Sequence, residues 1–347
     1  MRLTHCSICL IFFLVLLIVS PGKAGLPTGP DQPPMGPGGA QYPHKDVKKT
    51  SIGEFETKCY IYEPDNPRPA SAPILLFLHG MFASKPEYYD GWLEHLCKRG
   101  WIVIFPHYQG GGESPAHYTA NAAVTVKKAL RWLNDGNGVE PNRDQAAIIG
   151  HEYGGLVAAN LAAASRYFKL PVPGVVMILT PAVAAGLELY DLSGIRTGTL
   201  LQVVVGEDDL MDTGFPARQI YYAADNIPTV DKSFITLLSD THGTPALIAD
   251  RFAPLAPLDP AFVHELDRRR WEFIGLFRKG VHTRAIRGKP IDAMDFFGTW
   301  RLFDAMARIK WDGGAREVVF GNTESQRFMG YWSDGNRVRG LLASDRP

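Results

Sequence analysis

Short, almost uninterrupted apolar runs recur through the middle of the chain, and helix-like segments separate them. The runs 74–78 (ILLFL) and 175–179 (VVMIL) lack polar alternation, which is typical of strands buried on both faces. Further strands are expected at 58–62, 101–105, 146–149, 200–205 and 234–238, and helices at 86–99, 118–133 and 156–164. This alternation predicts an α/β fold with a mostly parallel sheet and helices on both faces.

The N-terminus has the composition of a targeting segment. An uncharged apolar run from Ile8 to Val19 follows Arg2, and small residues stand around Ala24. The run is short for a membrane-spanning helix, which needs about 20 apolar residues. It therefore predicts a signal peptide over 1–24 and a secreted or periplasmic protein, with an uncleaved membrane anchor as the alternative. Without that run, no stable membrane span is expected.

The remaining boundaries follow from changes in composition. Residues 25–50 are rich in Pro and Gly and predict a flexible linker. The α/β domain is expected over 51–257, followed by a mainly helical C-terminal extension over 258–347. Within that extension, the apolar pattern predicts helices at 262–277 and 291–309 and a short strand at 316–320.

Charge and cysteine content exclude several classes of function. The 36 Lys and Arg residues balance 36 Asp and Glu residues, so there is no basic excess for a nucleic-acid partner. Cys59 and Cys97 each fall inside a predicted element, which favours two buried thiols, although a bridge between them stays open. No clustered Cys or His pattern predicts a metal site, and no cofactor is implied.

The most specific local pattern is a strand that runs into a glycine-rich turn and then directly into a helix. It covers residues 146–163 (AAIIGHEYGGLVAANLAA), and Gly150 and Gly154 bracket Glu152. A sharp, crowded turn needs small residues at these two positions, and it projects the central side chain at the helix N-terminus. This is the geometry of a nucleophile elbow, in which G-x-S-x-G places a serine.

From about residue 58 to 255 the chain resembles the α/β-hydrolase fold superfamily. The resemblance rests on Leu78-His79-Gly80 after the PILLFL strand, on the elbow, and on two later loops. Within the superfamily the chain is most similar to the dienelactone hydrolase, chlorophyllase and cutinase-like branch. The resemblance implies a small-molecule substrate, ester-like or lipid-like.

The resemblance also implies the other members of a catalytic site. Asp209, in the loop GEDD after the strand at 200–205, takes the place of the family's acid, with Asp208 as the alternative register. His242, in the loop SDTHG, takes the place of the general base. The backbone N–H groups of Tyr153 and of Met81 or Phe82 are expected to form the oxyanion hole.

Glu152 stands where the family carries its serine. A carboxylate there could attack an sp3 carbon, could orient a water together with His242, could fill the oxyanion hole, or could join a structural ion cluster with His242 and Asp209. Two classes of function follow. One is an exported hydrolase of ester-like or other small electrophilic substrates, and the other is a catalytically inactive binding or scaffold protein.

Overall fold

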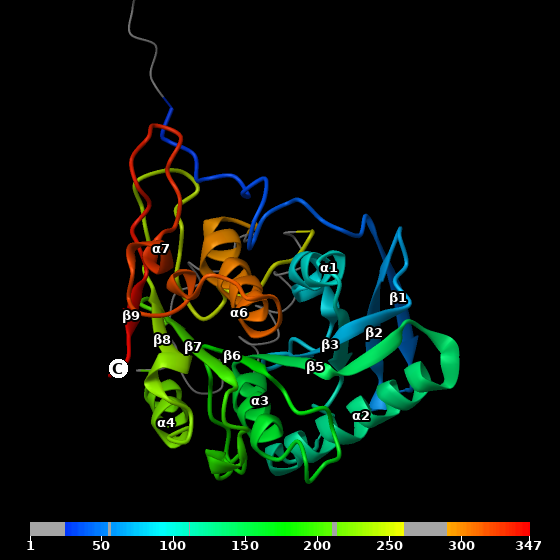
Figure 1. Cartoon of the computed structure of the whole chain (residues 1–347). Helices are drawn as coiled ribbons and strands as arrows, with labels where there is room; N and C mark the ends of the chain where they lie inside the picture. Colours follow the sequence, from blue (N-terminus) through cyan, green and yellow to red (C-terminus); the bar gives the residue numbers. More distant parts are fainter. Residues whose placement is uncertain (1–24, 55–56, 111, 210–213, 260–289) are drawn as a thin grey trace, which may run out of the picture.

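The centre of the molecule is a nine-stranded sheet in the order β1-β2-β4-β3-β5-β6-β7-β8-β9 (Figure 1). The computed structural model describes residues 25–54, 57–110, 112–209, 214–259 and 290–347. The strands are β1 (Asp46–Ile52), β2 (Cys59–Asp65), β3 (Ser71–Leu78), β4 (Ile102–Pro106), β5 (Glu140–His151), β6 (Val175–Leu179), β7 (Leu200–Gly206), β8 (Lys232–Leu237) and β9 (Leu342–Ser344). Strands β3 to β8 run parallel, whereas β1, β2 and β9 pair antiparallel with their neighbours.

Helices cover both faces of the sheet, as the apolar runs predict. Helices α1 (Asp90–Lys98) and α6 (Arg301–Asp312) lie on one face, and α2 (Tyr118–Trp132), α3 (Tyr153–Ala163) and α4 (Phe215–Ala223) lie on the other (Figure 1). In β6, Val175, Met177 and Leu179 pack into the first layer, while Val176 and Ile178 pack into the second. The order and direction of the strands confirm the expected α/β-hydrolase fold.

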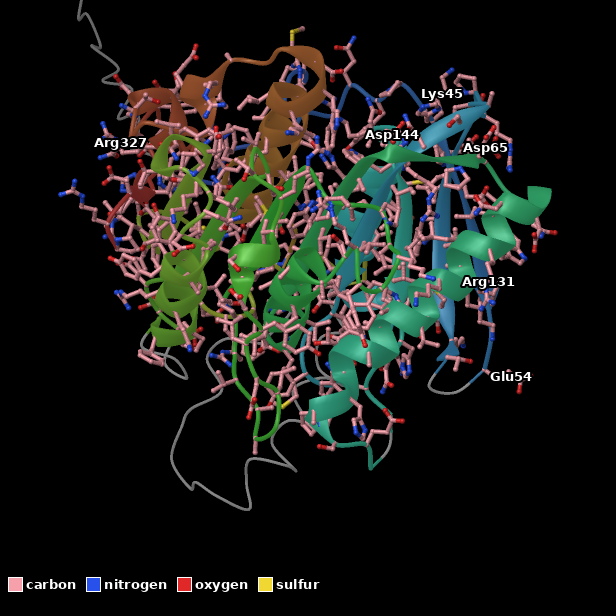
Figure 2. The ribbon with its side chains drawn as sticks, turned by 60° about the horizontal axis from the view of Figure 1, so that its bottom comes forward. Lys45, Glu54, Asp65, Arg131, Asp144 and Arg327 are labelled. Carbon is pink, nitrogen blue, oxygen red and sulfur yellow. The ribbon has the colours of Figure 1, made fainter. Side chains whose placement is uncertain are left out.

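Shorter helical segments connect these elements. They are Pro86–Tyr88, Pro115–His117, Leu133–Asn137, Leu192–Gly194, Thr229–Asp231, Met294–Trp300, Arg316–Val318 and α7 (Glu324–Arg327). Charged side chains on the outer elements point to solvent, as Figure 2 shows for Arg131 on α2 and Asp65 at the end of β2.

The C-terminal region differs from the expectation in one element. The strand expected at 316–320 is instead a single helical turn, Arg316–Val318. The backbone N–H of Phe320 donates to the carbonyl of Arg316 at 2.8 Å, so the turn buries Val319 and Phe320 without pairing to a strand. The extension still reaches the sheet, because β9 pairs with β8. The expected helix over 291–309 is confirmed as Met294–Trp300 followed by α6, and the one over 262–277 lies outside the described residues.

Residues 25–44, most of the linker expected over 25–50, lie along the C-terminal half of the molecule (Figure 1). The N–H of Gly38 donates to the Asp304 carboxylate at 2.8 Å, and the N–H of Thr28 donates to Ser333 Oγ at 2.9 Å. Strand β1 begins at Asp46, inside the predicted linker, because an exposed edge strand with charged residues carries no strong apolar signal. The segment is therefore part of the folded unit.

Cys59 and Cys97 are separate thiols, both buried. Burial raises the pKa of each thiol, which makes both poor nucleophiles. In the described ranges, no helix is both long enough and apolar enough to cross a membrane. The segment expected to direct export, residues 1–24, falls outside those ranges.

Candidate active site

The turn between β5 and α3 has the backbone of a nucleophile elbow. Strand β5 ends at His151 and α3 begins at Tyr153, so Glu152 alone joins them, with φ 50° and ψ −118°. A positive φ is strained for a residue with a side chain, and such strain persists only where the surroundings impose it. The turn is crowded on both sides of Glu152: a Cβ on Gly150 would lie 2.1 Å from the Gly154 carbonyl oxygen, and a Cβ on Gly154 would lie 2.2 Å from that of Leu78.

The Glu152 side chain occupies the position expected for the oxyanion. The backbone N–H of Met81 donates to Glu152 Oε2 at 2.9 Å. Gly80 allows this approach, because a Cβ at that position would lie 2.5 Å from Oε2. Tyr153 opens α3 immediately after Glu152, which places its backbone at the helix N-terminus. The carboxylate is only 1% exposed, so a predicted oxyanion-hole donor is already used by the protein's own anion.

Arg251 connects Glu152 to the expected acid. Its Nε and Nη2 donate to the two carboxylate oxygens of Asp209 at 3.0 and 3.1 Å, a bidentate arrangement. Its Nη1 lies 3.7 Å from Glu152 Oε1. The guanidinium therefore stands between Asp209 and Glu152, the residues expected as acid and nucleophile.

His242 lies elsewhere. Its Nε2 is 2.7 Å from Asp334 Oδ2 and 3.2 Å from Asn336 Nδ2, and its side chain is 40% exposed. The hydrogen bond from His242 lowers the pKa of Asp334. Within the described ranges, His242 has no hydrogen bond or ion pair with Glu152 or Asp209.

A neighbouring carboxylate explains where His242 lies. Asp240 accepts hydrogen bonds from the backbone N–H groups of His242 and Arg339 and from the indole of Trp332. These bonds attach the loop after β8 to the C-terminal region. The structure thus brings Glu152, the Met81 amide and Asp209 together, and it does not bring His242 to them. The alternative acid, Asp208, accepts from Ser239 Oγ at 2.6 Å and supports the same loop.

Tyr89 and His151, which the sequence does not single out, hold the segment around Arg251 in place. The backbone N–H of Gly80 donates to the Tyr89 hydroxyl at 2.9 Å, and this hydroxyl lies 2.8 Å from His151 Nδ1. His151 Nε2 lies 2.7 Å from the carbonyl oxygen of Arg251. Because a carbonyl oxygen only accepts, Nε2 carries the proton and Nδ1 accepts from Tyr89. One sequence signal could have pointed to Arg251: it is the first Lys or Arg after Lys232, and a buried elbow carboxylate needs a cation.

His79 packs under the loop that carries Gly80 and Met81. It is fully buried, its ring stacks on Tyr108 with centroids 4.4 Å apart, and its Nδ1 donates to the Gly80 carbonyl at 2.9 Å. Burial lowers its pKa to about 3, so the ring is neutral at physiological pH. His79 therefore supports the loop by packing and a neutral hydrogen bond. Within the described ranges, no group of three His, Cys, Asp or Glu side chains is placed to hold a metal ion.

Comparison with known proteins agrees with this architecture. A family model for the α/β-hydrolase fold matches residues 73–202, which run from β3 to the start of β7 and include the elbow. No curated protein matches the chain. The match supports the α/β-hydrolase superfamily and, through it, the general class of hydrolases that act on small molecules. The matched range includes Glu152 and stops before Asp209, His242 and Arg251.

Proposed function

We propose that this protein uses the α/β-hydrolase fold without the serine-type reaction, as a binding or scaffold protein whose elbow is a fixed ion cluster. The observation that carries the proposal is the position of Arg251, which pairs with Asp209 and Glu152 where a histidine base would have to stand. A guanidinium stays protonated at physiological pH and accepts no proton. It therefore cannot replace the histidine as a base.

The state of Glu152 supports the same proposal. Covalent catalysis needs a nucleophile that reaches the substrate, a base in hydrogen-bond reach, and open donors for the developing charge. Glu152 Oε2 is bonded to the Met81 amide and Oε1 faces Arg251, and both contacts draw electron density from the carboxylate. The same carboxylate fills the position that a substrate oxyanion would take.

A second candidate is hydrolysis of a small ester-like or other electrophilic substrate, with Glu152 as nucleophile or as the group that orients a water. The strained elbow backbone at Glu152 favours it, because strain of this kind is concentrated at functional sites. In this candidate, Glu152 leaves the Met81 amide before reaction, which frees that amide for the substrate.

A hydrolase panel separates the two candidates. Purified residues 25–347 would be assayed against short p-nitrophenyl esters, lactones, epoxides and haloalkanes, with Glu152→Gln as the paired variant. We expect no turnover above that of Glu152→Gln. Turnover that is lost in Glu152→Gln would overturn the proposal and select the second candidate. His242→Ala is the matched control, and it should change nothing because His242 lies with Asp334.

The Glu152→Ser variant tests the missing base directly. Serine at an elbow needs a base within hydrogen-bond reach, and Arg251 occupies that place. We expect Glu152→Ser to fold and to remain inactive toward short p-nitrophenyl esters. Esterase activity in this variant would show that a base does reach the elbow.

We also propose export, with cleavage near Ala24, on the strength of the apolar run 8–19 and the small residues after it. The intact mass and N-terminal sequence of the secreted protein test this proposal. A protein that begins at Met1 and remains in the membrane fraction would instead support the N-terminal anchor.

A further inference from the structure

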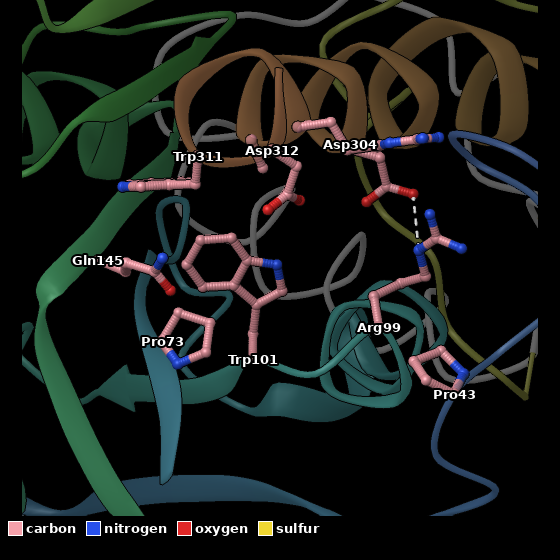
Figure 3. A pocket seen from close by; sticks show the side chains of 10 residues that line it. Pro43, Pro73, Arg99, Trp101, Gln145, Asp304, Trp311 and Asp312 are labelled. Atoms are coloured by element: carbon pink, nitrogen blue, oxygen red, sulfur yellow. Dashed lines mark ion pairs between the residues drawn. The ribbon is translucent and has the colours of Figure 1, made fainter. Parts of the chain in front are cut away.

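A cavity lies at the opposite end of the sheet from the elbow. Its volume is about 300 Å³, at the lower end of the range for small-molecule sites. It is lined by Pro73 near the start of β3, by Trp101 just before β4, and by residues of the last turns of α6 (Figure 3). The elbow lies at the carboxyl end of β5, so the two sites are separate.

A β-bulge shapes one wall of this cavity. Where β3 pairs with β5, Pro73 lies opposite Asn142 but Ile74 lies opposite Ala146, so residues 143–145 loop out of the ladder. Figure 2 shows Asp144 of this bulge at the rim of the molecule. Bulges re-aim side chains and are common beside functional sites. Here the bulge places Gln145 in the cavity wall (Figure 3).

Two tryptophans give the cavity an aromatic surface. The rings of Trp101 and Trp311 meet edge-on, with centroids 5.6 Å apart. Trp101 is 6% exposed and also packs on Phe303, which fixes its orientation, whereas Trp311 is half-buried. Pro43 and Pro73 add rigid apolar walls.

Several polar groups at the cavity are not used by the fold. Within the described ranges, the side chains of Gln145, Arg308 and Asp312 form no hydrogen bond or ion pair, and neither does the indole N–H of Trp101. Arg99 and Asp304, in contrast, pair with each other at 3.3 Å. The cavity therefore offers free donors and acceptors around an aromatic surface.

We propose that this cavity binds a neutral pyranose sugar. A pyranose presents C–H groups on one face, which pack on an indole, and hydroxyl groups at its edge, which both donate and accept hydrogen bonds. Amide, guanidinium and carboxylate groups suit those hydroxyls. The formal charges of Arg99 and Arg308 balance those of Asp304 and Asp312, so the cavity does not select a strongly charged ligand.

Titration with defined sugars tests the proposal. The probes are methyl glucoside, methyl N-acetylglucosaminide and cellobiose, followed by tryptophan emission and by saturation-transfer NMR. We expect saturable binding of at least one sugar with a millimolar Kd. Trp311→Ala should weaken that binding about tenfold, the scale of one lost aromatic contact. Trp132→Ala, which removes a half-buried tryptophan that does not line the cavity, should leave the affinity for the sugar unchanged.

Charge-neutral variants distinguish a sugar from a charged ligand. Arg308→Gln and Asp312→Asn keep hydrogen-bonding groups, so sugar binding should survive in both. Glu152→Gln should also leave it intact, which separates this site from the elbow. The proposal is overturned if no sugar binds saturably, or if Trp311→Ala binds the sugar as tightly as the unaltered protein.

Discussion

Replacing Arg251 by methionine should destabilise the fold strongly. Arg251, Asp209 and Glu152 are only 7%, 6% and 1% exposed, so the variant leaves two carboxylates in a site shielded from water without this cation. Removing one partner of a buried ion pair costs about 3–5 kcal/mol, because the remaining charge loses its compensation. A loss of that size lowers the midpoint of thermal unfolding by about 10 °C in a large domain.

A double-mutant cycle shows whether Glu152 contributes to this loss. Urea unfolding, followed by tryptophan emission, would be measured for Arg251→Met, Glu152→Gln and the double variant. With Glu152 uncharged, the cost of Arg251→Met should fall by at least about 1 kcal/mol. Arg316→Met, which breaks an exposed pair with Asp231, is the matched control and should cost less than about 1 kcal/mol. Equal costs of Arg251→Met in both backgrounds would refute the coupling of Glu152 to Arg251.

Three further predictions concern the loop before the elbow and the N-terminal segment. Gly80→Ala would bring a Cβ to 2.5 Å from Glu152 Oε2, so we expect the free energy of unfolding in urea to fall by about 1–3 kcal/mol. Adding Glu152→Ala should relieve this loss, and an unrelieved loss would contradict the contact. Burial lowers the pKa of His79 to about 3, so the unfolded chain binds a proton there that the folded protein does not between about pH 6.5 and 3. Stability should therefore fall as pH drops through that window, and less so in His79→Gln; parallel pH profiles would argue against a neutral buried ring. Burial raises the pKa of Asp304, but His95, Arg99 and the Gly38 N–H outweigh burial and lower the pKa overall. The ionised Asp304 carboxylate therefore stabilises the fold above about pH 4, and this stabilisation is lost as the pH falls further. Asp304→Asn should speed proteolysis within residues 25–44 at neutral pH, and an unchanged cleavage rate would refute the role of Asp304 in holding that segment.

The central sheet was predictable because each buried strand has a local signal. The run 175–179 is apolar at every position, and the structure buries it on both faces. The elbow was predictable because its glycines are spaced within one short segment and Gly150 is required by a local contact with Gly154, although Gly154 is itself crowded by the distant Leu78. Strand β1 was missed because an edge strand is exposed, and its sequence DVKKTSI carries almost no apolar pattern.

The composition of the site depends on long-range contacts that no local pattern encodes. His242 has the family's position in the sequence, but Asp240 and the C-terminal residues Trp332 and Asp334 determine where its loop lies. Arg251 lies between Glu152 and Asp209 because two buried carboxylates need a cation, and the position of that cation is visible only once the two carboxylates are known to be adjacent. The sequence therefore predicted the elbow backbone better than the side-chain contacts around it.

The packing of the N-terminal segment has a consequence for how the chain is made. Its hydrogen bonds Thr28–Ser333 and Gly38–Asp304 join positions 305 and 266 residues apart. Because the ribosome releases residues in order, Thr28 and Gly38 are synthesised long before Ser333 and Asp304, with which they form hydrogen bonds. Contacts of such long sequence separation form late. The stretch from Thr28 to Gly38 therefore stays accessible to translocation or processing machinery until Asp304 and Ser333 have emerged.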